Sequence, residues 1–482
     1  MQTTAITGRD RIFVDGTWQA PASGAAIEVV NPATEQVIGT VPAGDEADIA
    51  AAVGAAAAAA PGWAATPPAE RARILDAAHA ELTRRADEAA DLISTELGAP
   101  RPLARRLHVD LPLSVLRSYV DLLGSYEFTE RVGNSRVHAT PVGVVGAITP
   151  WNYPLHQPMV KVAAATAAGC AVVLKPAEDT PLIAYLLAEV FAAAGLPAGV
   201  LNVVSGTGPV AGSALAAHPD IDMVSFTGST AVGRRIGATA GGNLKRVALE
   251  LGGKSANVIL PGAELTKAVK VGVGNAFLNS GQTCSAWTRM LVHADAYDEV
   301  VALAADAAAK YRPGNPFDQA TRLGPLVADR QRTRVRGYID AGVTSGAELI
   351  IGGAEPPDGL DHGYFVSPTV FAEVGPRMTI AQEEIFGPVL SILRYHDEDE
   401  ALEIANGTRY GLHGAVWAAD DDTAAAFAAR MRTGQVDING GEFNHRAPFG
   451  GFKDSGVGRE FGRHGLEEFL TYQSQQFTSG AA

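Results

Sequence analysis

The chain contains two cysteines among its 482 residues, and they lie in different surroundings. Cys284 lies among small and polar residues in the segment NSGQTCS at 279–285, which is typical of an accessible loop. Cys170 lies among apolar residues in AGCAV at 168–172 and fits the usual role of a free cysteine as a small buried hydrophobe. A cysteine nucleophile must be a thiolate when it attacks, so a catalytic Cys284 needs a base or electropositive surroundings.

Two types of residue could serve as that base. A papain-like hydrolase pairs its cysteine with a histidine, but none of the 11 histidines is an obvious partner and no signature of that family is present. The other candidate is Glu250, which opens ELGGK at 250–254 directly after an apolar run. A lone glutamate is usually a solvated surface residue, whereas one followed by small residues at a strand end is better placed in a cleft.

Alternating strands and helices must position these groups. We expect strands at 142–148, 171–174, 200–204, 223–226 and 245–249, and helices at 153–168, 182–194, 210–217 and 230–240. Strands of nearly continuous apolar residues between helices predict a parallel sheet covered on both faces. Upstream we expect a hairpin near 12–18, strands at 27–30 and 37–41, and helices at 45–60 and 70–97. A second α/β stretch is expected from about 263 to 439.

Polar or glycine-rich residues follow all five strands, where such sheets bind ligands. They are TPWN at 149–152, KPAE at 175–178, SGTG at 205–208, TGST at 227–230 and ELGGK at 250–254. The usual dinucleotide fingerprint is absent, and 206–212 is a near miss with one extra residue. The turn at 228–233 opens a helix whose N-terminus could face a pyrophosphate, although tight turns without a ligand carry similar glycines. Lys175 and Glu178 could hold ribose hydroxyls, and this carboxylate would repel a 2′-phosphate.

Composition excludes several classes of protein. The chain has 38 basic and 53 acidic side chains, a formal net charge of −15, and no basic run that suits nucleic acid. Residues 1–11 do not resemble a signal peptide and no stretch approaches a membrane span, so we expect a cytoplasmic protein without a membrane partner. No HExxH, CxxC or EF-hand pattern predicts a metal site, and the acidic run at 420–422 suits a helix cap.

Together these segments resemble the NAD(P)-dependent aldehyde dehydrogenase superfamily, from about residue 13 to 469. The resemblance rests on motifs in the family's order: PWNYP at 150–154, KPAE at 175–178, FTGST at 226–230, LELGGK at 249–254, GQTC at 281–284, EEIFGPV at 383–389, PFGGFK at 448–453 and SG at 455–456. It implies a Rossmann-type cofactor domain, an α/β catalytic domain and a small β oligomerisation arm. The implied boundaries are 1–122 and 142–252, 253–440, and 123–141 with 469–482, while 441–468 form a substrate-mouth loop that returns to the cofactor domain.

By this resemblance, Cys284 attacks the aldehyde, and the Asn152 amide with the Cys284 N–H stabilises the oxyanion. Glu250 then activates the water that hydrolyses the thioester. Lys161 and Glu460 resemble residues that tune acidity or relay protons. The implied cofactor is NAD, with NADP less favoured because of Glu178.

The residues that the resemblance assigns to the cofactor lie mainly at the five strand ends. Lys175 and Glu178 would take the adenosine ribose, and Glu384 the nicotinamide ribose. The full set is Ile148, Thr149, Pro150, Trp151, Lys175, Glu178, Gly208, Phe226, Gly228, Ser229, Val232, Leu251, Gly252, Glu384 and Phe386.

The expected substrate pocket departs from well-known members, because its wall carries polar residues where many members are apolar or aromatic. Val160 also replaces the arginine typical of succinic semialdehyde enzymes. Arg446 is either a solvated loop residue or the partner of a distal carboxylate on a longer semialdehyde. The expected pocket residues are Tyr153, His156, Gln157, Val160, Thr283, Ser285, Phe443, Arg446 and Phe449.

The arm predicts a homodimer or homotetramer, because exposed edge strands pair with other chains. Three alternatives stay open beside a hydrolytic aldehyde dehydrogenase. An acyl-transferring relative would lack Glu250, and a non-catalytic homologue would lose Cys284 or Glu250. A thiol esterase would share the thioester chemistry, and we expect such activity only as a side reaction.

Overall fold

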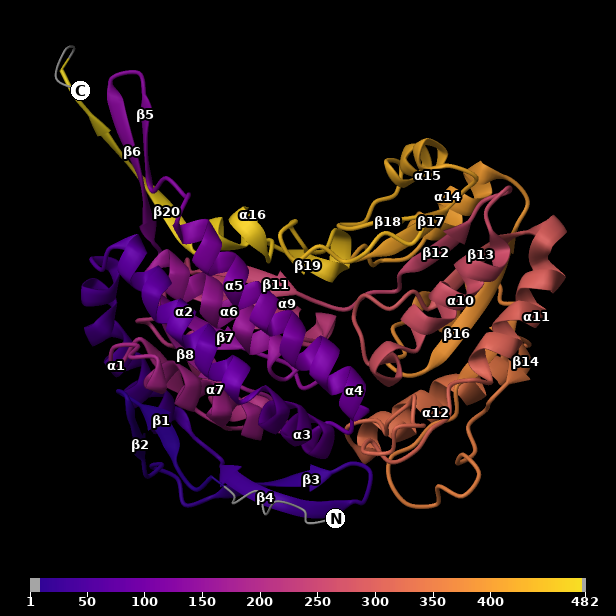
Figure 1. Ribbon diagram of the computed structural model, residues 1–482, viewed down its shortest axis with the longest axis horizontal. Coiled ribbons are helices and arrows are strands. Elements are labelled where there is room, and N and C mark those ends of the chain that lie inside the picture. Colours follow the sequence, from indigo (N-terminus) through magenta and orange to yellow (C-terminus); the bar gives the residue numbers. More distant parts are fainter. Residues whose placement is uncertain (1–8, 479–482) are drawn as a thin grey trace.

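The computed structural model describes residues 9–478. Residues 1–8 and 479–482, at the ends of the expected cofactor domain and arm, lie outside the described residues. Figure 1 shows two α/β lobes side by side and a narrow β extension that projects from one of them. The fold is of the mixed α/β class that the sequence predicts.

The first lobe is built on an eight-stranded sheet in the order β19-β11-β10-β7-β8-β9-β1-β2. Its strands are β1 (Ile12–Val14), β2 (Thr17–Gln19), β7 (Val144–Ile148), β8 (Ala171–Lys175), β9 (Leu201–Val203), β10 (Met223–Thr227), β11 (Arg246–Glu250) and β19 (Gly456–Val457). The five strands from β11 to β9 are parallel neighbours, and they are the five expected from the sequence. β3 (Ala26–Asn31) and β4 (Gln36–Pro42) form a separate two-stranded sheet.

The register brings the polar strand ends to one edge. Ile148 lies opposite both Lys175 and Phe226, and Thr227 lies opposite Glu250. From β7 the chain proceeds through β8 and β9 on one side, then returns to β10 and β11 on the other. Ligands of open α/β sheets bind where the strand order reverses in this way, which here is the carboxyl end of β7.

Helices cover both faces of this sheet, as the apolar strands predict. On one face lie α1 (Glu46–Ala64), the π-helix η2 (Gly208–Gly212), α8 (Ser213–Ala217) and α9 (Thr230–Gly242). On the other lie α2 (Pro68–Arg84), α3 (Ala86–Glu96), the π-helix η1 (Ala104–Asp110), α5 (Leu111–Leu123), α6 (His156–Ala168), α7 (Leu182–Ala193) and α16 (Gly462–Glu467). The short α4 (Arg101–Leu103) precedes η1 and has no buried residue. Every residue of α6 is buried.

Three helix boundaries differ from the expectation. α6 begins at His156 rather than 153, because Pro158 has no N–H to bond the carbonyl of Pro154 and extend the helix backwards. α1 continues through Pro61 to Ala64, where the proline lies in the exposed last turn. The segment 70–97 forms two helices that meet at Arg85.

The second lobe contains a seven-stranded sheet in the order β14-β15-β16-β13-β12-β17-β18. The strands are β12 (Ala256–Ile259), β13 (Arg289–His293), β14 (Glu348–Ile351), β15 (Thr369–Ala372), β16 (Val389–Tyr395), β17 (Gly414–Trp417) and β18 (Asp437–Ile438). One face packs on α12 (Asp329–Thr344), α13 (Thr379–Gln382), α14 (Glu398–Asn406) and α15 (Asp421–Ala428). The other packs on α10 (Leu265–Ala276) and α11 (Tyr297–Ala308). Short 3-10 turns are η3 (Leu278–Gly281), η4 (Ala294–Ala296) and η5 (Lys453–Ser455).

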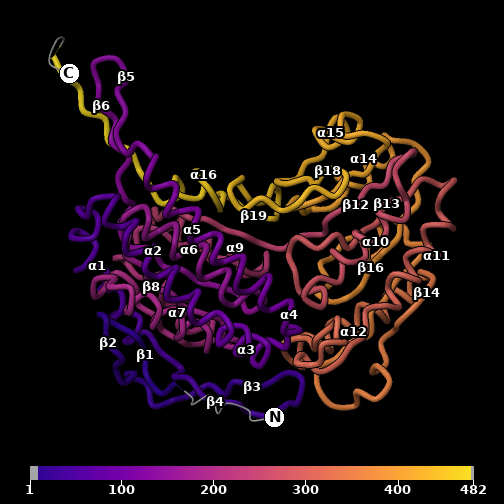
Figure 2. Tube along the Cα trace, in the orientation of Figure 1, coloured from indigo at the N-terminus to yellow at the C-terminus, as the bar shows by residue number. Residues whose placement is uncertain are grey.

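The projecting extension is a three-stranded antiparallel sheet in the order β20-β6-β5. It consists of β5 (Thr129–Val132), β6 (Ser135–Pro141) and β20 (Leu470–Gln476). Figure 2 shows the yellow C-terminal trace running beside β6, and Leu470 lies opposite Pro141. Segments more than 300 residues apart in the sequence therefore build the expected β arm together.

Helix α1 is long and apolar enough to cross a membrane by length and composition alone, with a mean hydropathy of 1.2 over 18 residues. The sequence expectation counted only the alanine run at 55–60, which is too short for a membrane span, whereas the observed helix continues on both sides of it. Its first turn carries Glu46 and Asp48, and Ile49 and Val53 are buried against the first sheet. One face of α1 thus packs on the first lobe, and 33% of the apolar window is buried.

Candidate active site

The loop that carries Cys284 has an unusual backbone. Asn279 and Ser280 adopt positive φ angles of 52° and 58°, and Gly281 follows with φ 75°. A Cβ at position 281 would lie 2.0 Å from the carbonyl oxygen of Gly387, so only glycine fits there. The loop is held against the segment 383–389 and leaves the Cys284 side chain part-exposed.

Asn152, which follows β7, is fixed against this loop. Its side-chain amide donates to the carbonyl of Gln282 over 3.0 Å. Its own carbonyl accepts a hydrogen bond from the Asn279 amide at 2.8 Å. In the next position, the Tyr153 and Thr283 hydroxyls lie 2.8 Å apart. These contacts bring an N–H donor and the only part-exposed thiol of the described residues to one place.

Glu250 ends β11 and is 5% exposed, yet neither of its carboxylate oxygens has a hydrogen-bond partner. Burial raises its pKa well above the ordinary value, and the charge of Glu460 adds to this, while Lys161 acts against it. A Cβ at Gly450 would lie 2.7 Å from Glu250 Oε1, so glycine there leaves space for the carboxylate. An unpartnered buried carboxylate with a raised pKa is a typical general base.

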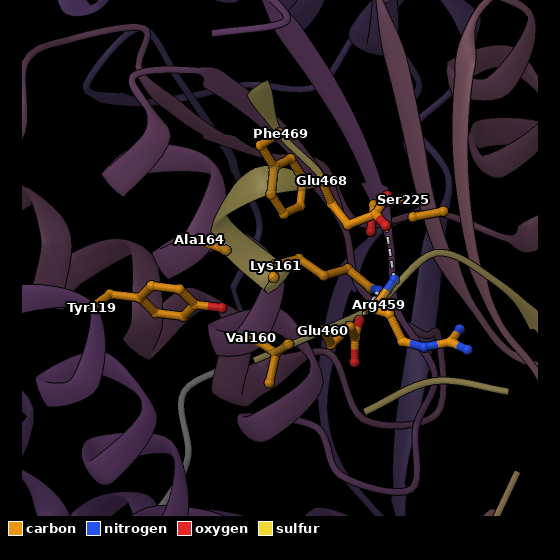
Figure 3. A pocket seen from close by; sticks show the side chains of 11 residues that line it. Tyr119, Val160, Lys161, Ala164, Ser225, Arg459, Glu460, Glu468 and Phe469 are labelled. Atoms are coloured by element: carbon orange, nitrogen blue, oxygen red, sulfur yellow. Dashed lines mark hydrogen bonds and ion pairs between the residues drawn. The ribbon is translucent and has the colours of Figure 1, made fainter. Parts of the chain in front are cut away.

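Lys161 and Glu460 form a buried ion pair, with Nζ and Oε1 2.7 Å apart. Figure 3 shows the cavity beside this pair, which Tyr119, Arg459 and Glu468 also line. Two polar atoms here lack partners, namely Tyr119 Oη and Glu460 Oε2. The pair therefore lies where its charges act on Glu250.

Charge around Cys284 opposes ionisation of the thiol. Burial of the sulfur, followed by the carboxylates of Glu384 and Glu250, raises the pKa of Cys284. Glu384 itself accepts a hydrogen bond from the N–H of Gly253 at 3.1 Å, and burial raises its pKa to about 7. A Cβ at Gly252 would lie 2.2 Å from Glu384 Oε2, so the carboxylate rests on the turn that follows Glu250.

At the other end of the expected cofactor edge, Lys175 is buried and Glu178 is half-buried, with 3.7 Å between Nζ and Oε2. The Lys175 ammonium donates to the carbonyls of Pro176 and Gly206, at 2.6 and 3.1 Å. Burial lowers the pKa of Lys175, although Glu178 partly offsets this. The Lys175 ammonium and the Glu178 carboxylate therefore lie side by side at this strand end, as the sequence predicts.

The start of α9 supplies backbone donors at the same edge. Ser229 caps the helix by accepting from the N–H of Val232 at 3.4 Å. Gly228 lies against the Phe226 ring, which a Cβ would approach to 2.5 Å, and Gly208 at the start of η2 has open space beside it. Close backbone approach at a helix N-terminus is the usual way to accommodate a pyrophosphate.

The remaining expected cofactor residues lie around the end of β7 and the turn after β11. Trp151 meets Phe386 edge to face, with ring centroids 5.3 Å apart. The Thr149 N–H donates a hydrogen bond to the Lys175 carbonyl at 3.2 Å, and the Thr149 hydroxyl is buried without a partner. The rest of this group are buried or half-buried: Ile148, Pro150, Leu251 and Gly252.

The expected substrate wall is buried and polar. His156 stacks on Phe461 with centroids 5.7 Å apart and meets the Tyr153 ring edge to face. Burial, helped by His445, lowers the pKa of His156 to about 3, so its ring is neutral at physiological pH. Gln157 Oε1 and His156 Nδ1 have no partner. Val160 lines the cavity beside Lys161, while the Ser285 carbonyl lies 3.2 Å from His413.

The expected mouth is an aromatic cluster rather than a cationic one. Phe443 is part-exposed and packs on Phe449 and Phe461, with centroids 6.2 and 5.6 Å away. Arg446 instead pairs with Asp121 on α5 at 3.2 Å, and both side chains are exposed. The structure thus brings the phenylalanines together and leaves Arg446 on the surface.

Sequence reasoning missed several contacts. Asn279 and Gln282 fix Asn152, Phe461 completes the aromatic cluster, and His108 stacks on Tyr153 with centroids 4.6 Å apart. Asn279 and Gln282 were visible as polar residues beside Cys284, but nothing in their spacing identified Asn152 as the partner. Within residues 9–478, no cluster of three histidine, cysteine or acidic side chains is placed to hold a metal ion.

Comparison with known proteins identifies the family to which the chain is similar. A model of the aldehyde dehydrogenase family matches residues 18–475. The chain is 47% identical over 459 residues to a 3-succinoylsemialdehyde-pyridine dehydrogenase of a Pseudomonas species, covering 95% of this chain and 96% of that protein. It is 44% identical over 462 residues to a putative aldehyde dehydrogenase of Staphylococcus aureus strain MSSA476, covering 96% and 97%.

Two solved structures have nearly the same fold. A mutant of aldehyde dehydrogenase C from Pseudomonas syringae, complexed with NAD⁺ and octanal, gives a TM-score of 0.97 at 46% identity and 98% coverage of both chains. An aldehyde dehydrogenase of Mycobacterium tuberculosis complexed with NAD⁺ gives 0.97 at 45% identity and 99% coverage of both. On this evidence, the chain belongs to the aldehyde dehydrogenase family.

Proposed function

We propose that this enzyme oxidises an aldehyde to the carboxylic acid with NAD, using Cys284 as nucleophile and Glu250 as general base. One observation carries the proposal. Glu250 is a buried carboxylate without a hydrogen-bond partner, at the sheet edge where the Cys284 loop and the Asn152 amide meet. Such a carboxylate is costly to keep unless it has a function.

The residues at the sheet edge fit a dinucleotide. Gly208 has open space beside it and Gly228 has no side chain, so backbone can approach the pyrophosphate at the start of α9. Lys175 and Glu178 would bind the adenosine ribose, and Glu384 and Phe386 would hold the nicotinamide end. When bound, NAD supplies the acceptor for the hydride that leaves the substrate.

Glu178 supports NAD over NADP. Its carboxylate lies 3.7 Å from the Lys175 ammonium, so a 2′-phosphate bound by that lysine would also meet a negative charge. Glu178→Ser should therefore raise kcat/KM for NADP relative to NAD. An unchanged ratio of the two values in this variant would contradict the assignment.

The first chemical step belongs to Cys284. Its raised pKa means that the thiol is protonated at neutral pH when the site is empty, so a base must take the proton before the sulfur attacks the carbonyl carbon. Glu250 is the candidate for this transfer as well, because it is unpartnered and its own pKa is raised. The Asn152 amide and the Cys284 N–H would then stabilise the oxyanion.

The second step is hydrolysis of the thioester on Cys284. After it has released the Cys284 proton to solvent, Glu250 would take a proton from a water molecule that attacks the acyl carbon, and the thiolate of Cys284 would leave. Lys161 and Glu460 would tune this base, since Lys161 lowers and Glu460 raises the pKa of Glu250. The retained Glu250 favours hydrolysis over transfer of the acyl group to another thiol.

The wall next to Asn152 suggests a neutral substrate. Tyr153, His156 and Gln157 offer an aromatic surface with hydrogen-bonding atoms, and the low pKa of His156 leaves no positive charge there. The Phe443, Phe449 and Phe461 cluster would contact the apolar part. The P. syringae relative has been solved with octanal, so a medium-length aliphatic aldehyde is the first substrate to assay.

A semialdehyde is the second candidate, because a relative at 47% identity is a semialdehyde dehydrogenase. Arg446 would have to release Asp121 before it could bind a distal carboxylate. Arg446→Ala should then lower kcat/KM only for substrates with that carboxylate. Equal values with and without the carboxylate, unaffected by the substitution, would remove this candidate.

We also propose that the arm pairs with another copy of the chain, giving a homodimer or homotetramer. Val132 and Tyr472 are more than half exposed on the arm sheet, and β20 and β5 are its edge strands, the kind that pairs with other chains. The first lobe would serve as cofactor domain and the second as catalytic domain. Light scattering on the purified protein gives its mass directly, and a monomer at micromolar concentration would contradict the assembly.

The whole proposal is tested by reduced-cofactor absorbance. Purified protein is mixed with NAD or NADP and a panel of aliphatic, aromatic, terpenoid and semialdehyde substrates. Faster reduction of NAD with at least one simple aldehyde is expected. No turnover with any aldehyde and either cofactor would contradict the proposed function.

A further inference from the structure

Lys254 is a buried amine outside the proposed chemistry. It follows Gly253 in the turn after β11, is 2% exposed, and its Nζ has no hydrogen-bond partner. Burial of an ammonium without a partner costs several kcal/mol, on the order of the whole stability of many domains. Most buried lysines of a folded protein are paired, as Lys161 is with Glu460 here.

Lys254 is one of the residues that line a small cavity, most of whose other lining residues are cationic or polar. The residues that define its polar character are Lys254, Ser255, Arg289, Asn406, Arg432 and Thr433. Two of the hydroxyls, Ser255 Oγ and Thr433 Oγ1, also lack a partner. None of the described residues that line the cavity carries a carboxylate.

Arg289 adds a second buried positive charge that no acid neutralises by contact. Its guanidinium donates to three backbone carbonyls, those of Lys254, Ile404 and Ala405, at 2.9, 2.6 and 2.9 Å. Carbonyl oxygens orient the guanidinium but leave its net charge in place. The cavity therefore combines two buried cations, Lys254 and Arg289, with two hydroxyls that lack a partner.

The nearest acids are occupied elsewhere. Glu384 accepts from the N–H of Gly253, and Glu383 accepts from the Tyr338 hydroxyl at 2.6 Å. Both carboxylates act on Lys254 only through their fields. His413 also lines the cavity, and its Nε2 lies 3.1 Å from Asp437 Oδ1. The Asp437 carboxylate therefore faces the histidine and not Lys254.

We propose that this cavity is a binding site for a single-atom anion of the halide class, held by the Lys254 ammonium and the hydroxyls of Ser255 and Thr433. The space is of the order of one small particle, so it favours a single-atom anion over a tetrahedral anion such as phosphate. An anion would supply the counterion that the described side chains do not.

Protonation of Lys254 accompanies the binding. Burial, followed by the charge of Arg289, lowers the pKa of Lys254 to about 7, so near neutral pH the amine is close to balance between its charged and neutral forms. An anion in contact with Nζ favours the charged form. The groups that face this amine from neighbouring segments are Arg289, Glu383 and Glu384.

The site adjoins the proposed catalytic centre without being part of it. A Cβ at Gly253 would lie 2.5 Å from the Cys284 carbonyl oxygen, and the same residue donates to Glu384. An anion on Lys254 would thus fix the backbone turn that separates it from Cys284 and Glu384. The inference does not depend on the proposed function, because its test measures binding rather than turnover.

Bromide is the probe, because its anomalous scattering locates it in a crystal. Crystals of the full chain grown with sodium bromide should show an anomalous peak within hydrogen-bond distance of Lys254 Nζ. The peak should be absent in Lys254→Met and weaker in Ser255→Ala. The second variant retains the ammonium, so it still tests the site if Lys254→Met fails to fold. A water molecule alone beside Nζ in the wild-type crystal would overturn the proposal.

Thermal unfolding gives the solution test. At constant ionic strength, replacing gluconate by chloride should raise the Tm of the wild type by about 2 °C or more at saturation. Lys254→Met should lose this difference, whereas Lys270→Met, at an exposed lysine, should retain it. Equal responses of the wild type and Lys254→Met would overturn the proposal. A bromide peak in the crystal would then report binding at crystal concentration only.

Discussion

The two cysteines occupy regions that differ in packing, backbone and charge. Cys170 lies between α6 and β8, is fully buried, and its thiol donates to the Phe469 carbonyl at 3.4 Å. Cys284 lies in the loop after α10, is part-exposed, and has the carboxylates of Glu250 and Glu384 close enough to act on its ionisation. The same side chain is a core component in one region and a candidate nucleophile in the other.

The glycines beside the two cysteines show how each region is held. Gly169 ends α6 with φ 101°, a common helix terminus, and its neighbours are Arg71 and Pro141. Gly281 lies in a run of three left-handed residues and contacts the backbone of Gly387. Strained backbone of this kind is kept where the surroundings over-determine it, frequently at active sites. Access and backbone strain, rather than residue type, therefore distinguish the candidate nucleophile from the core cysteine.

The largest effect is expected when the Cys284 thiol is replaced by a hydroxyl, with the same replacement at Cys170 as the control. Cys284→Ser should lower kcat by on the order of 10³-fold or more, because the hydroxyl is a far weaker nucleophile at neutral pH. Cys170→Ser is the matched control and should retain kcat, since its Sγ lies in the hydrophobic core and donates to the Phe469 carbonyl, away from the Cys284 loop. Steady-state cofactor reduction measures both, and comparable losses in the two variants would erase the distinction between the regions.

The next effect concerns the donor that faces the Cys284 loop. Asn152→Ala should lower kcat by roughly 10²- to 10³-fold, the usual consequence of losing one oxyanion donor. Asn279→Ala should have a smaller effect, because Asn279 only positions Asn152 through its carbonyl. Single-turnover rates with one aldehyde compare them. A larger loss in Asn279→Ala than in Asn152→Ala would contradict the assigned donor.

The pH dependence of kcat should respond to the buried charges around Glu250. As a base it acts only when deprotonated, so kcat should fall as the pH drops through its raised pKa. Glu460→Gln removes a negative charge and should move this limb to lower pH, whereas Lys161→Met should move it to higher pH, each by about one unit. Shifts in the same direction for both variants would contradict electrostatic control.

The smallest effect is expected at Cys170. Cys170→Ala removes one buried sulfur and should lower the stability by about 1 kcal/mol, with little change in kcat. The Cys170 side chain is fully buried whereas Cys284 is part-exposed, so Cys170 should also resist alkylation at neutral pH. Thermal unfolding and peptide mass mapping after iodoacetamide treatment check both points. Labelling of Cys170 before Cys284 would reverse the comparison.

The sequence predicted the first sheet well, because its strands are short apolar runs with clear turn residues after them. All five parallel strands were located within two residues of their observed ends, and Lys175, Thr227 and Glu250 lie at the expected edge. The expected separation of Cys170 from Cys284 also agrees with their burial. These features depend on local patterns that a single sequence displays.

Contacts between distant segments could not be predicted from the sequence in the same way. The orientation of Asn152 depends on Gln282, 130 residues away, and Arg446 pairs with Asp121 across 325 residues. No periodicity or turn residue reports such pairings. The continuation of α1 through Pro61 was missed for another reason. A proline in the exposed last turn of a helix removes only one backbone hydrogen bond, so the helix can continue past it.

The most direct test of the central claim is the fate of the acyl group in Glu250→Gln. Without the base, deacylation should become slow, so one rapid turnover should release about one equivalent of reduced cofactor per active site before turnover slows by roughly 10²- to 10⁴-fold. Mass spectrometry of the quenched protein should then find the acyl group on the peptide that contains Cys284. Full steady-state activity in this variant, or an acyl group on any other residue, would contradict the account.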